Sequence, residues 1–161
     1  MKNFKYTLLL AAILFSANCS FASSDKESAD GNEVKSDDDL TGEVIVLNKE
    51  DFLKKIYNYE KNSQEWVYEG SLPCIIDFYA NWCPPCKKVE PILKELAKEY
   101  KGKMIIYKIN VDNERELAKA FGISSIPTYF FISVKGELQY ALGALPRENF
   151  VKVIEEYILK N

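Results

Sequence analysis

The sequence predicts an α/β fold in which a central mixed sheet of about five strands is flanked by helices. Two observations lead to this prediction. Apolar runs of strand length alternate with segments whose apolar residues recur at helical spacing, which is typical of parallel β-α-β units. Near the C-terminus, two β-rich runs follow each other across a short turn, which predicts an antiparallel hairpin at the edge of the sheet.

The first strand is expected at Val44–Leu47, where four apolar residues are consecutive. Asn48 followed by Asp51 is an N-cap signal for the next helix. This helix after Asn48 is indicated by an apolar stripe that consists of Phe52, Leu53, Ile56 and Tyr57. The following residues 59–72 are less regular and are interpreted as a loop with room for one helical turn.

The second strand, Cys74–Ala80, is apolar except for Asp77, as expected for a strand that is covered on both faces. A helical pattern over Pro84–Tyr100 follows, and then a strand over Met104–Asn110. Cys74, at the start of its strand, is interpreted as a small buried thiol.

The remaining elements complete a β-α-β-α-β-α-β-β-α order. Asp112 or Asn113 is expected to cap a helix that stops at Gly122. Strands at Thr128–Ser133 and Glu137–Ala141 form the hairpin. A last helix with one apolar face is indicated by Phe150, Val153, Ile154, Tyr157 and Ile158.

The N-terminus has the three-part layout of a secretory signal. Lys2 and Lys5 form a basic start, and the apolar run Leu8–Phe15 is followed by small and polar residues. This run is too short to span a bilayer, which takes about 20 residues. A buried N-terminal helix is the alternative, and the order of the three parts disfavours it.

Two processing sites compete. Small residues at Ser20 and Ala22 favour cleavage after Ala22, which makes residues 1–22 a signal peptide. Alternatively, residues 16–19 resemble a bacterial lipobox in which Cys19 carries the lipid. Only in that case would the protein be anchored to a membrane. Asn18 and Ser16 depart from that pattern, which favours the soluble product. Residues 23–42 are polar and are interpreted as a disordered linker, and the folded domain is assigned to residues 43–161.

The composition excludes several functional classes. A net charge of −3 leaves no electrostatic footprint for nucleic acid. The absence of histidine excludes histidine-assisted nucleophiles and histidine-ligated metals. With 161 residues and 4 cysteines, the chain is long enough to be stabilised by an apolar core rather than by disulfides. We expect it to be a monomer.

The stretch from Trp82 to Lys87, with Cys83 and Cys86 three positions apart between a strand and a helix, indicates a dithiol redox site. Unpaired N–H groups and the dipole at a helix N-terminus favour the thiolate, which is the attacking form. The two intervening prolines lack an N–H, so the pKa of Cys83 is expected near ~7, with a reducing couple. A zinc site is disfavoured because few further ligands remain. The sequence therefore predicts no metal.

These residues resemble the thioredoxin family, closely over residues 73–159 and more loosely over residues 43–71. Two departures are visible: Pro84 stands where the most familiar family motif has glycine, and Tyr79 occupies a position that is often tryptophan. The matching motifs are Asp77–Cys83, Pro84–Lys87, Pro91–Leu93, the cis-proline loop Ile126–Thr128 and the late glycine turn Gly143–Leu145.

The resemblance implies a thioredoxin fold with a redox-active disulfide between Cys83 and Cys86. In this family the first cysteine is the more exposed one and attacks the substrate, and the second resolves the mixed disulfide. Asp77 is implied as the proton acceptor for Cys86, with a surface aspartate as the alternative. Lys108 is implied to tune Asp77, or else it is a solvated strand lysine.

A substrate-binding surface is also implied. The bond before Pro127 is expected to be cis, so that the loop with Ile126 lies against the dithiol and pairs with an extended substrate segment. Trp82 is expected to flank the site, Gly143 to allow close backbone approach, and Pro91 to kink the active-site helix.

The expected function is the reduction or isomerisation of protein disulfides in the periplasm or cell envelope, as part of cell redox homeostasis. No cofactor is needed. The expected partners are disulfide-containing client proteins and a membrane thiol that donates electrons. One alternative is a specialised reductant for cytochrome c maturation, which the short connection after the third strand disfavours. Another is a non-catalytic binding module, which the intact Cys83, Cys86 and Asp77 disfavour.

Overall fold

The computed structural model describes residues 42–160. The predicted signal peptide, both processing sites and all of the predicted linker except Gly42 lie outside these residues. Within the described part, no helix has the length and apolar character that crossing a membrane requires.

The described chain follows the predicted order of strands and helices. The strands are β1 (Val44–Val46), β2 (Cys74–Tyr79), β3 (Ile105–Asn110), β4 (Thr128–Ile132) and β5 (Leu138–Leu142). The helices are α2 (Lys49–Lys55), α3 (Pro84–Glu99), α4 (Arg115–Ala120), α5 (Arg147–Val153) and the π-helical turn η1 (Ile154–Ile158). The predicted cap of α2 is confirmed, because the Asn48 side chain accepts a hydrogen bond of 2.8 Å from the N–H of Asp51.

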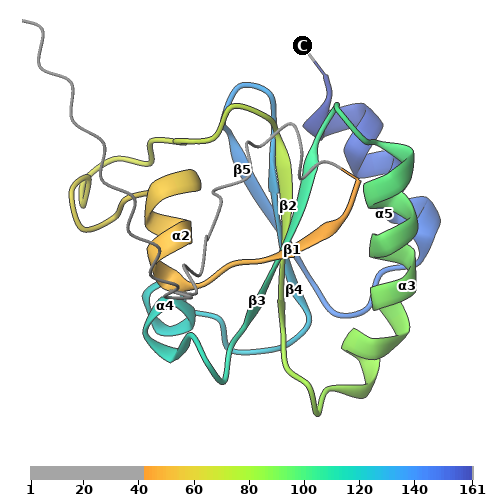
Figure 1. Ribbon diagram of the computed structural model, residues 1–161, viewed down its shortest axis with the longest axis horizontal. Coiled ribbons are helices and arrows are strands. Elements are labelled where there is room, and N and C mark those ends of the chain that lie inside the picture. The colour runs from red at the N-terminus through yellow and green to blue at the C-terminus, as the bar shows by residue number, and fades with distance from the viewer. Residues whose placement is uncertain (1–41, 161) are drawn as a thin grey trace, which may run out of the picture. The chain divides into compact units, whose positions relative to one another are not determined.

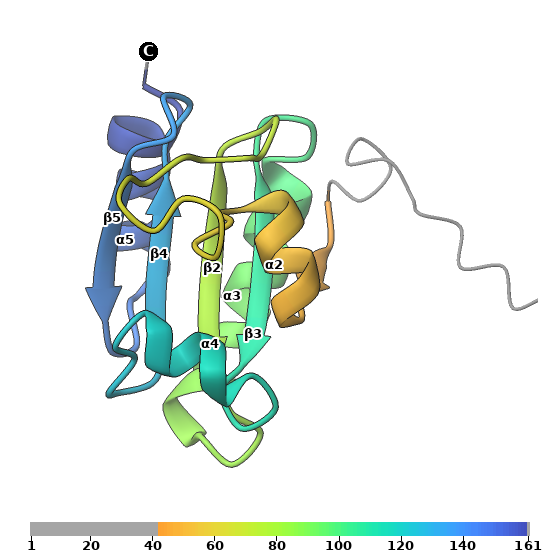
Figure 2. The ribbon, with the colours of Figure 1, turned by 90° about the vertical axis from the view of Figure 1, so that its left-hand side faces the viewer.

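The five strands form one mixed sheet in the order β1-β3-β2-β4-β5. Strands β1, β3 and β2 are parallel, whereas β4 and β5 pair antiparallel and end the sheet, as Figure 2 shows. Helices α2 and α4 cover one face and α3 and α5 cover the other (Figure 1). The predicted α/β architecture is confirmed.

Alternation along β2 gives the sheet an apolar core on each face. Ile76 and Phe78 belong to the core under α2 and α4, while Ile75 belongs to the core that contains Leu93 of α3. Burying a side chain of this size stabilises the fold by roughly 1.5–3 kcal/mol. Because Asp77 follows Ile75 by two positions, its side chain points to the same face as Ile75, toward α3.

The start of α4 differs from expectation. Neither Asp112 nor Asn113 caps this helix; Glu114 occupies the N-cap and makes no side-chain cap bond. Asn110 explains the difference, because its side chain and carbonyl hold the turn by accepting hydrogen bonds of 2.9 Å from the N–H groups of Asp112 and Glu114.

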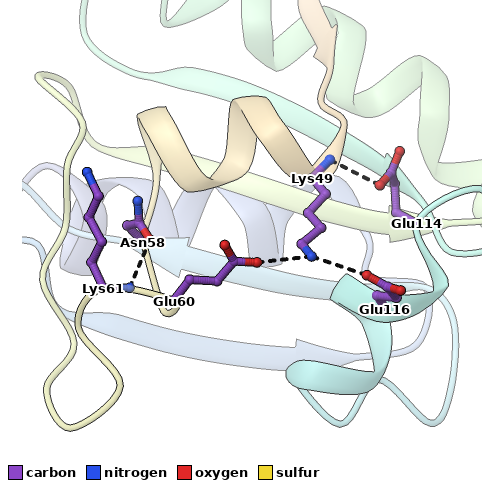
Figure 3. Close-up of polar contacts among 6 residues, drawn as sticks. All are labelled: Lys49, Asn58, Glu60, Lys61, Glu114 and Glu116. Atoms are coloured by element: carbon purple, nitrogen blue, oxygen red, sulfur yellow. Dashed lines mark hydrogen bonds and ion pairs between the residues drawn. The ribbon is translucent and has the colours of Figure 1, made fainter.

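The carboxylate of Glu114 is directed elsewhere. It accepts a hydrogen bond of 3.0 Å from the backbone N–H of Lys49, at the start of α2. The Lys49 ammonium lies 3.0 Å from Glu60 and 3.1 Å from Glu116, so this one residue links α2, the following loop and α4 (Figure 3).

The last helix is not uniform. After Val153 it widens into the π-turn η1, where the N–H of Leu159 donates to the carbonyl of Ile154, five residues earlier. The fully buried side chains Phe150, Ile154 and Ile158 are spaced by four residues and form the apolar face that the sequence predicts for this helix.

Candidate active site

Cys83 and Cys86 are joined by a disulfide at the start of α3, with their Cα atoms 5.4 Å apart. Strand β2 leads into this turn at the lower end of the sheet in Figure 1. Cys83 is the N-cap residue, and Pro84 and Pro85 fill the first two helical positions. A missing N–H is tolerated at the start of a helix, where the first N–H groups have no intrahelical partner. The two prolines therefore begin the helix directly after the first cysteine.

The first available N–H of the helix points at the sulfur of Cys83. It belongs to Cys86 and donates to Cys83 Sγ over 3.2 Å. The sequence correctly indicates that neither proline can donate a hydrogen bond to Cys83. It did not indicate that the N–H of Cys86, at the third helical position, would donate instead. This donor was detectable, since an N-cap side chain commonly accepts a bond from the third helical residue.

Both cysteines are buried in the disulfide form. Cys83 is 2% and Cys86 5% exposed, so the expectation that Cys83 is the more exposed of the pair is wrong for this structure. The reason is packing, because the disulfide forms an apolar cluster with Ala80, against which Val111 and Ile126 lie. Exposure therefore does not distinguish the two sulfurs, whereas position at the helix N-cap does.

Asp77 is buried beside the disulfide, and the surface alternative is excluded. It is 5% exposed and lines a cavity of about 310 Å³ together with Cys86. Burial raises the pKa of its carboxyl to about 7, opposed by the positive charge of Lys108 and assisted by the negative charge of Glu90. A carboxyl with such a pKa exchanges protons readily near neutrality.

Lys108 faces the same cavity. The parallel pairing of β2 and β3 places it opposite Asp77 in register. Its ammonium lies 3.7 Å from a carboxylate oxygen of Glu90 and 5.0 Å from the centre of the Tyr79 ring. The Lys108 side chain is 21% exposed and lines the cavity together with Asp77, so it is not a fully solvated strand lysine.

The predicted cis-proline loop reaches the cysteine cluster through one residue. The Ile126–Pro127 bond is cis, which confirms the expectation. The carbonyl of Pro127 accepts a hydrogen bond of 2.8 Å from the N–H of Gly143, which joins the cis-proline loop to the end of β5. Ile126 contacts the cysteine cluster.

The structure gives a backbone reason for glycine at position 143. Its φ of +81° is a left-handed conformation that side-chain-bearing residues rarely adopt. No described atom beyond its chain neighbours lies within 4 Å of a Cβ built there, so packing within the chain does not require glycine.

Trp82 flanks the disulfide and is 66% exposed. Its indole N–H donates a hydrogen bond of 2.8 Å to the carboxylate of Asp112. Asp112 is therefore a neighbour of the site that the sequence did not reveal, since nothing in the pattern indicates that the turn after β3 reaches Trp82. Pro91 lies inside α3, where it cannot donate a backbone hydrogen bond.

Cys74 lies at the opposite end of β2 from the disulfide. It is fully buried, and burial raises the pKa of its thiol to about 12, as expected for an inert core cysteine. A zinc site would need ligands that converge, and residues 42–160 contain no group of three or more Cys, His, Asp or Glu side chains placed to hold a metal ion.

Comparisons with known proteins agree with this geometry. The family model described as Thioredoxin matches residues 43–156. A thioredoxin from Borreliella burgdorferi is 42% identical over 114 residues, which cover 71% of this chain and 97% of that protein. A thioredoxin from Chlorobaculum thiosulfatiphilum is 38% identical over 99 residues, covering 62% of this chain and 92% of that one.

Solved structures show the same fold. A mutant thioredoxin from Halobacterium salinarum superposes with a TM-score of 0.59 at 24% identity, over 75% of this chain and 96% of that chain. Chloroplastic thioredoxin z gives the same TM-score and identity, over 71% of this chain and 93% of that chain.

Proposed function

The chain belongs to the thioredoxin family and is a protein-disulfide reductase, and from this premise we propose that Cys83 and Cys86 perform the exchange on disulfide-bonded proteins of the cell envelope. One observation carries the assignment of the two cysteines. Cys83 Sγ sits at the N-cap of α3, accepts the N–H of Cys86 and is bonded to the sulfur of Cys86.

The reaction starts from the reduced dithiol. The thiolate of Cys83 attacks one sulfur of a client disulfide, which forms a mixed disulfide and releases the other client sulfur as a thiolate. The thiolate of Cys86 then attacks Cys83 Sγ, and the second client sulfur leaves. Two electrons have passed to the client, and the protein is left with the Cys83–Cys86 disulfide seen in this structure.

Asp77 is proposed to accept the proton of Cys86 before the second attack. The shared cavity supports this role, because it connects the carboxyl to Cys86. The pKa of about 7 supports it as well, since a base of this strength is ionised in a substantial fraction of molecules near neutral pH. Lys108 is proposed to keep that pKa from rising further.

The client is proposed to bind across the cis-proline loop. The exposed indole of Trp82 offers an apolar surface on one side of the disulfide. Ile126 packs against the cysteine cluster, and the carbonyl of the adjacent Pro127 accepts the N–H of Gly143. An extended client segment would pair with that backbone, as in other cases of strand addition.

The location is inferred from the N-terminal segment. The basic start, the short apolar run and the small residues before Ser23 support export and cleavage after Ala22. Disulfides persist in such compartments, so clients would be present there. Because cytosolic reductants would not reach the protein, we propose a membrane thiol as its electron donor. We propose that the protein acts as a monomer, because one chain carries both cysteines that the exchange requires.

Two experiments test the proposal. Insulin-disulfide reduction should be rapid with the wild type and absent with Cys83→Ser, while equal turnover by the two would refute the catalytic assignment. Cys86→Ser should trap clients as mixed disulfides in cell-envelope extracts. Capture of apocytochrome c alone would favour the specialised reductant instead. The mass of the mature N-terminus decides between cleavage after Ala22 and a lipid on Cys19.

A further inference from the structure

Two buried oxygens near the site have no hydrogen-bond partner within the described part of the chain. One is Oδ1 of Asp77 and the other is the hydroxyl of Tyr129. A hydroxyl or a carboxylate that is buried without a partner destabilises the fold, so such atoms are uncommon and call for an explanation.

The sheet brings these two residues together. In the antiparallel pairing of β2 and β4, Asp77 and Tyr129 are directly opposite each other. Residues in this relation project to the same face, with Cβ atoms about 4.5–5.5 Å apart. Both side chains therefore belong to the layer between the sheet and helices α3 and α5.

Aromatic neighbours restrict the Tyr129 ring. It is fully buried, its centre lies 5.0 Å from that of Phe150 in an edge-to-face contact, and Phe131 stacks beside it at 6.3 Å. Burial and the charge of Asp77 together hold the pKa of the Tyr129 hydroxyl far above its usual range. The group therefore keeps its proton and is available as a donor.

We propose that Tyr129 is a positioning residue for Asp77, whose carboxylate Oδ1 receives a hydrogen bond from the Tyr129 hydroxyl through one buried water molecule. The hydroxyl donates to the water, and the water donates to Oδ1. A bridging water satisfies both oxygens, which do not bond each other directly. Its consequence for the reaction rests on the proposed role of Asp77 as the proton acceptor for Cys86.

The proposed bond adds to the charges that already surround Asp77. From β3, Lys108 favours the ionised carboxylate, and from α3, Glu90 opposes it. Cys86 and Lys87 of α3 line the same cavity, and α5 contributes the apolar Phe150 behind Tyr129. Tyr129 would add a neutral donor from β4. A donor to the charged form stabilises it, so the bond should lower the pKa of Asp77.

The decisive variant is Tyr129→Phe, which keeps the ring and removes only the hydroxyl. In the oxidised protein, the titration midpoint of the Asp77 carboxyl, followed by carbon NMR, should move upward by roughly half to one pH unit. Tyr100→Phe is the matched control. Its hydroxyl bonds Glu155 at 3.2 Å and not Asp77, so the midpoint should stay in place.

Several results would overturn the inference. If the titration midpoint of Asp77 is the same in Tyr129→Phe and in the wild type, the water-bridged bond is excluded. If Tyr129→Phe also unfolds at a higher temperature than the wild type, the Tyr129 hydroxyl has no hydrogen-bond partner. If Tyr129→Phe does not fold, the wild type still decides: the Tyr129 hydroxyl proton should exchange slowly and show a cross-peak to bound water, and the absence of that cross-peak refutes the proposal. The titration is independent of insulin reduction, so failure of the proposed function would show separately.

Discussion

The backbone N–H of Cys86 donates a hydrogen bond to the sulfur of Cys83, the atom that the Cys86 thiolate attacks in the resolving step. One residue therefore stabilises the attacking sulfur with its backbone and later displaces the client from it with its side chain. Both roles follow from the three-residue spacing, because it places the second cysteine at the third position of the helix that the first one caps.

The two prolines allow this donor to be tested. An N-cap side chain accepts from the second or third helical N–H, and Pro85 blocks the second. Pro85→Ala should add a donor to the Cys83 thiolate and lower the pKa of its thiol by roughly half to one unit, measured by thiolate absorbance in the reduced protein. The reduction potential should become more oxidising.

Pro84→Ala is the control for this change. It restores an N–H at the first helical position, which is not directed at the cap side chain. Its thiol pKa should stay close to that of the wild type. Equal pKa shifts in both variants would mean that loss of proline rigidity, and not the new donor, is responsible.

The buried carboxyl of Asp77 should make stability depend on pH. Its pKa is about 7 in the folded protein, against 3.8 for the unperturbed group, so the folded state binds the proton more tightly than the unfolded state. The resulting stabilisation is fully present below pH ~4 and is lost as pH rises to about 7. The free energy of unfolding should fall by roughly 2–4 kcal/mol over that range.

Asp77→Asn should remove most of this pH dependence. Urea unfolding of the oxidised protein at several pH values measures it, with Asp112→Asn as a control on the exposed side of the site. If wild type and Asp77→Asn lose stability in parallel between pH ~4 and ~7, the carboxyl is not protonated as described.

Gly143 should be needed for its backbone conformation and not for space. Gly143→Ala forces a side chain into a left-handed residue and should destabilise the protein by about 1 kcal/mol in chemical unfolding. Because the N–H of Gly143 bonds the carbonyl of Pro127, client affinity should weaken as well. A fully stable variant with wild-type KM for insulin would contradict both expectations.

Much of this architecture could be predicted from local patterns. The order of strands and helices and the cap at Asn48 depend on neighbouring residues, and both are confirmed. The cis bond at Pro127 is confirmed as well, but only the family resemblance implied it. The burial of Asp77 could also be predicted, because a single carboxyl in an apolar strand that is covered on both faces must lie inside.

Features that depend on tertiary contacts could not be predicted. The N-cap of α4 is Glu114 and not Asp112 or Asn113, because the Asn110 side chain holds the preceding turn. The Glu114 carboxylate accepts a hydrogen bond from the N–H of Lys49, a residue distant in sequence. The pairing of Asp77 with Tyr129 requires the strand register, which hydrophobic alternation alone leaves open by two-residue steps.

Lys108 should set the pH at which the resolving step accelerates. The rate of mixed-disulfide resolution should rise as Asp77 ionises, around pH ~7, and Asp77→Asn should abolish this rise. Lys108→Met removes the positive charge that favours the carboxylate, so the midpoint of the rise should move to higher pH. Stopped-flow measurement of client release across pH follows both changes.

Lys94→Met gives the matched comparison, since Lys94 pairs with Glu90 at 2.9 Å but does not line the cavity of Asp77. Its loss leaves Glu90 free to draw the Lys108 ammonium closer, so the midpoint should move far less than in Lys108→Met. The Asp77 carboxyl responds to charge according to distance and burial, and the exposed Lys94–Glu90 pair is weakened by solvent. Equal shifts from both lysines would show that net charge near α3, and not the cavity lysine, controls the base.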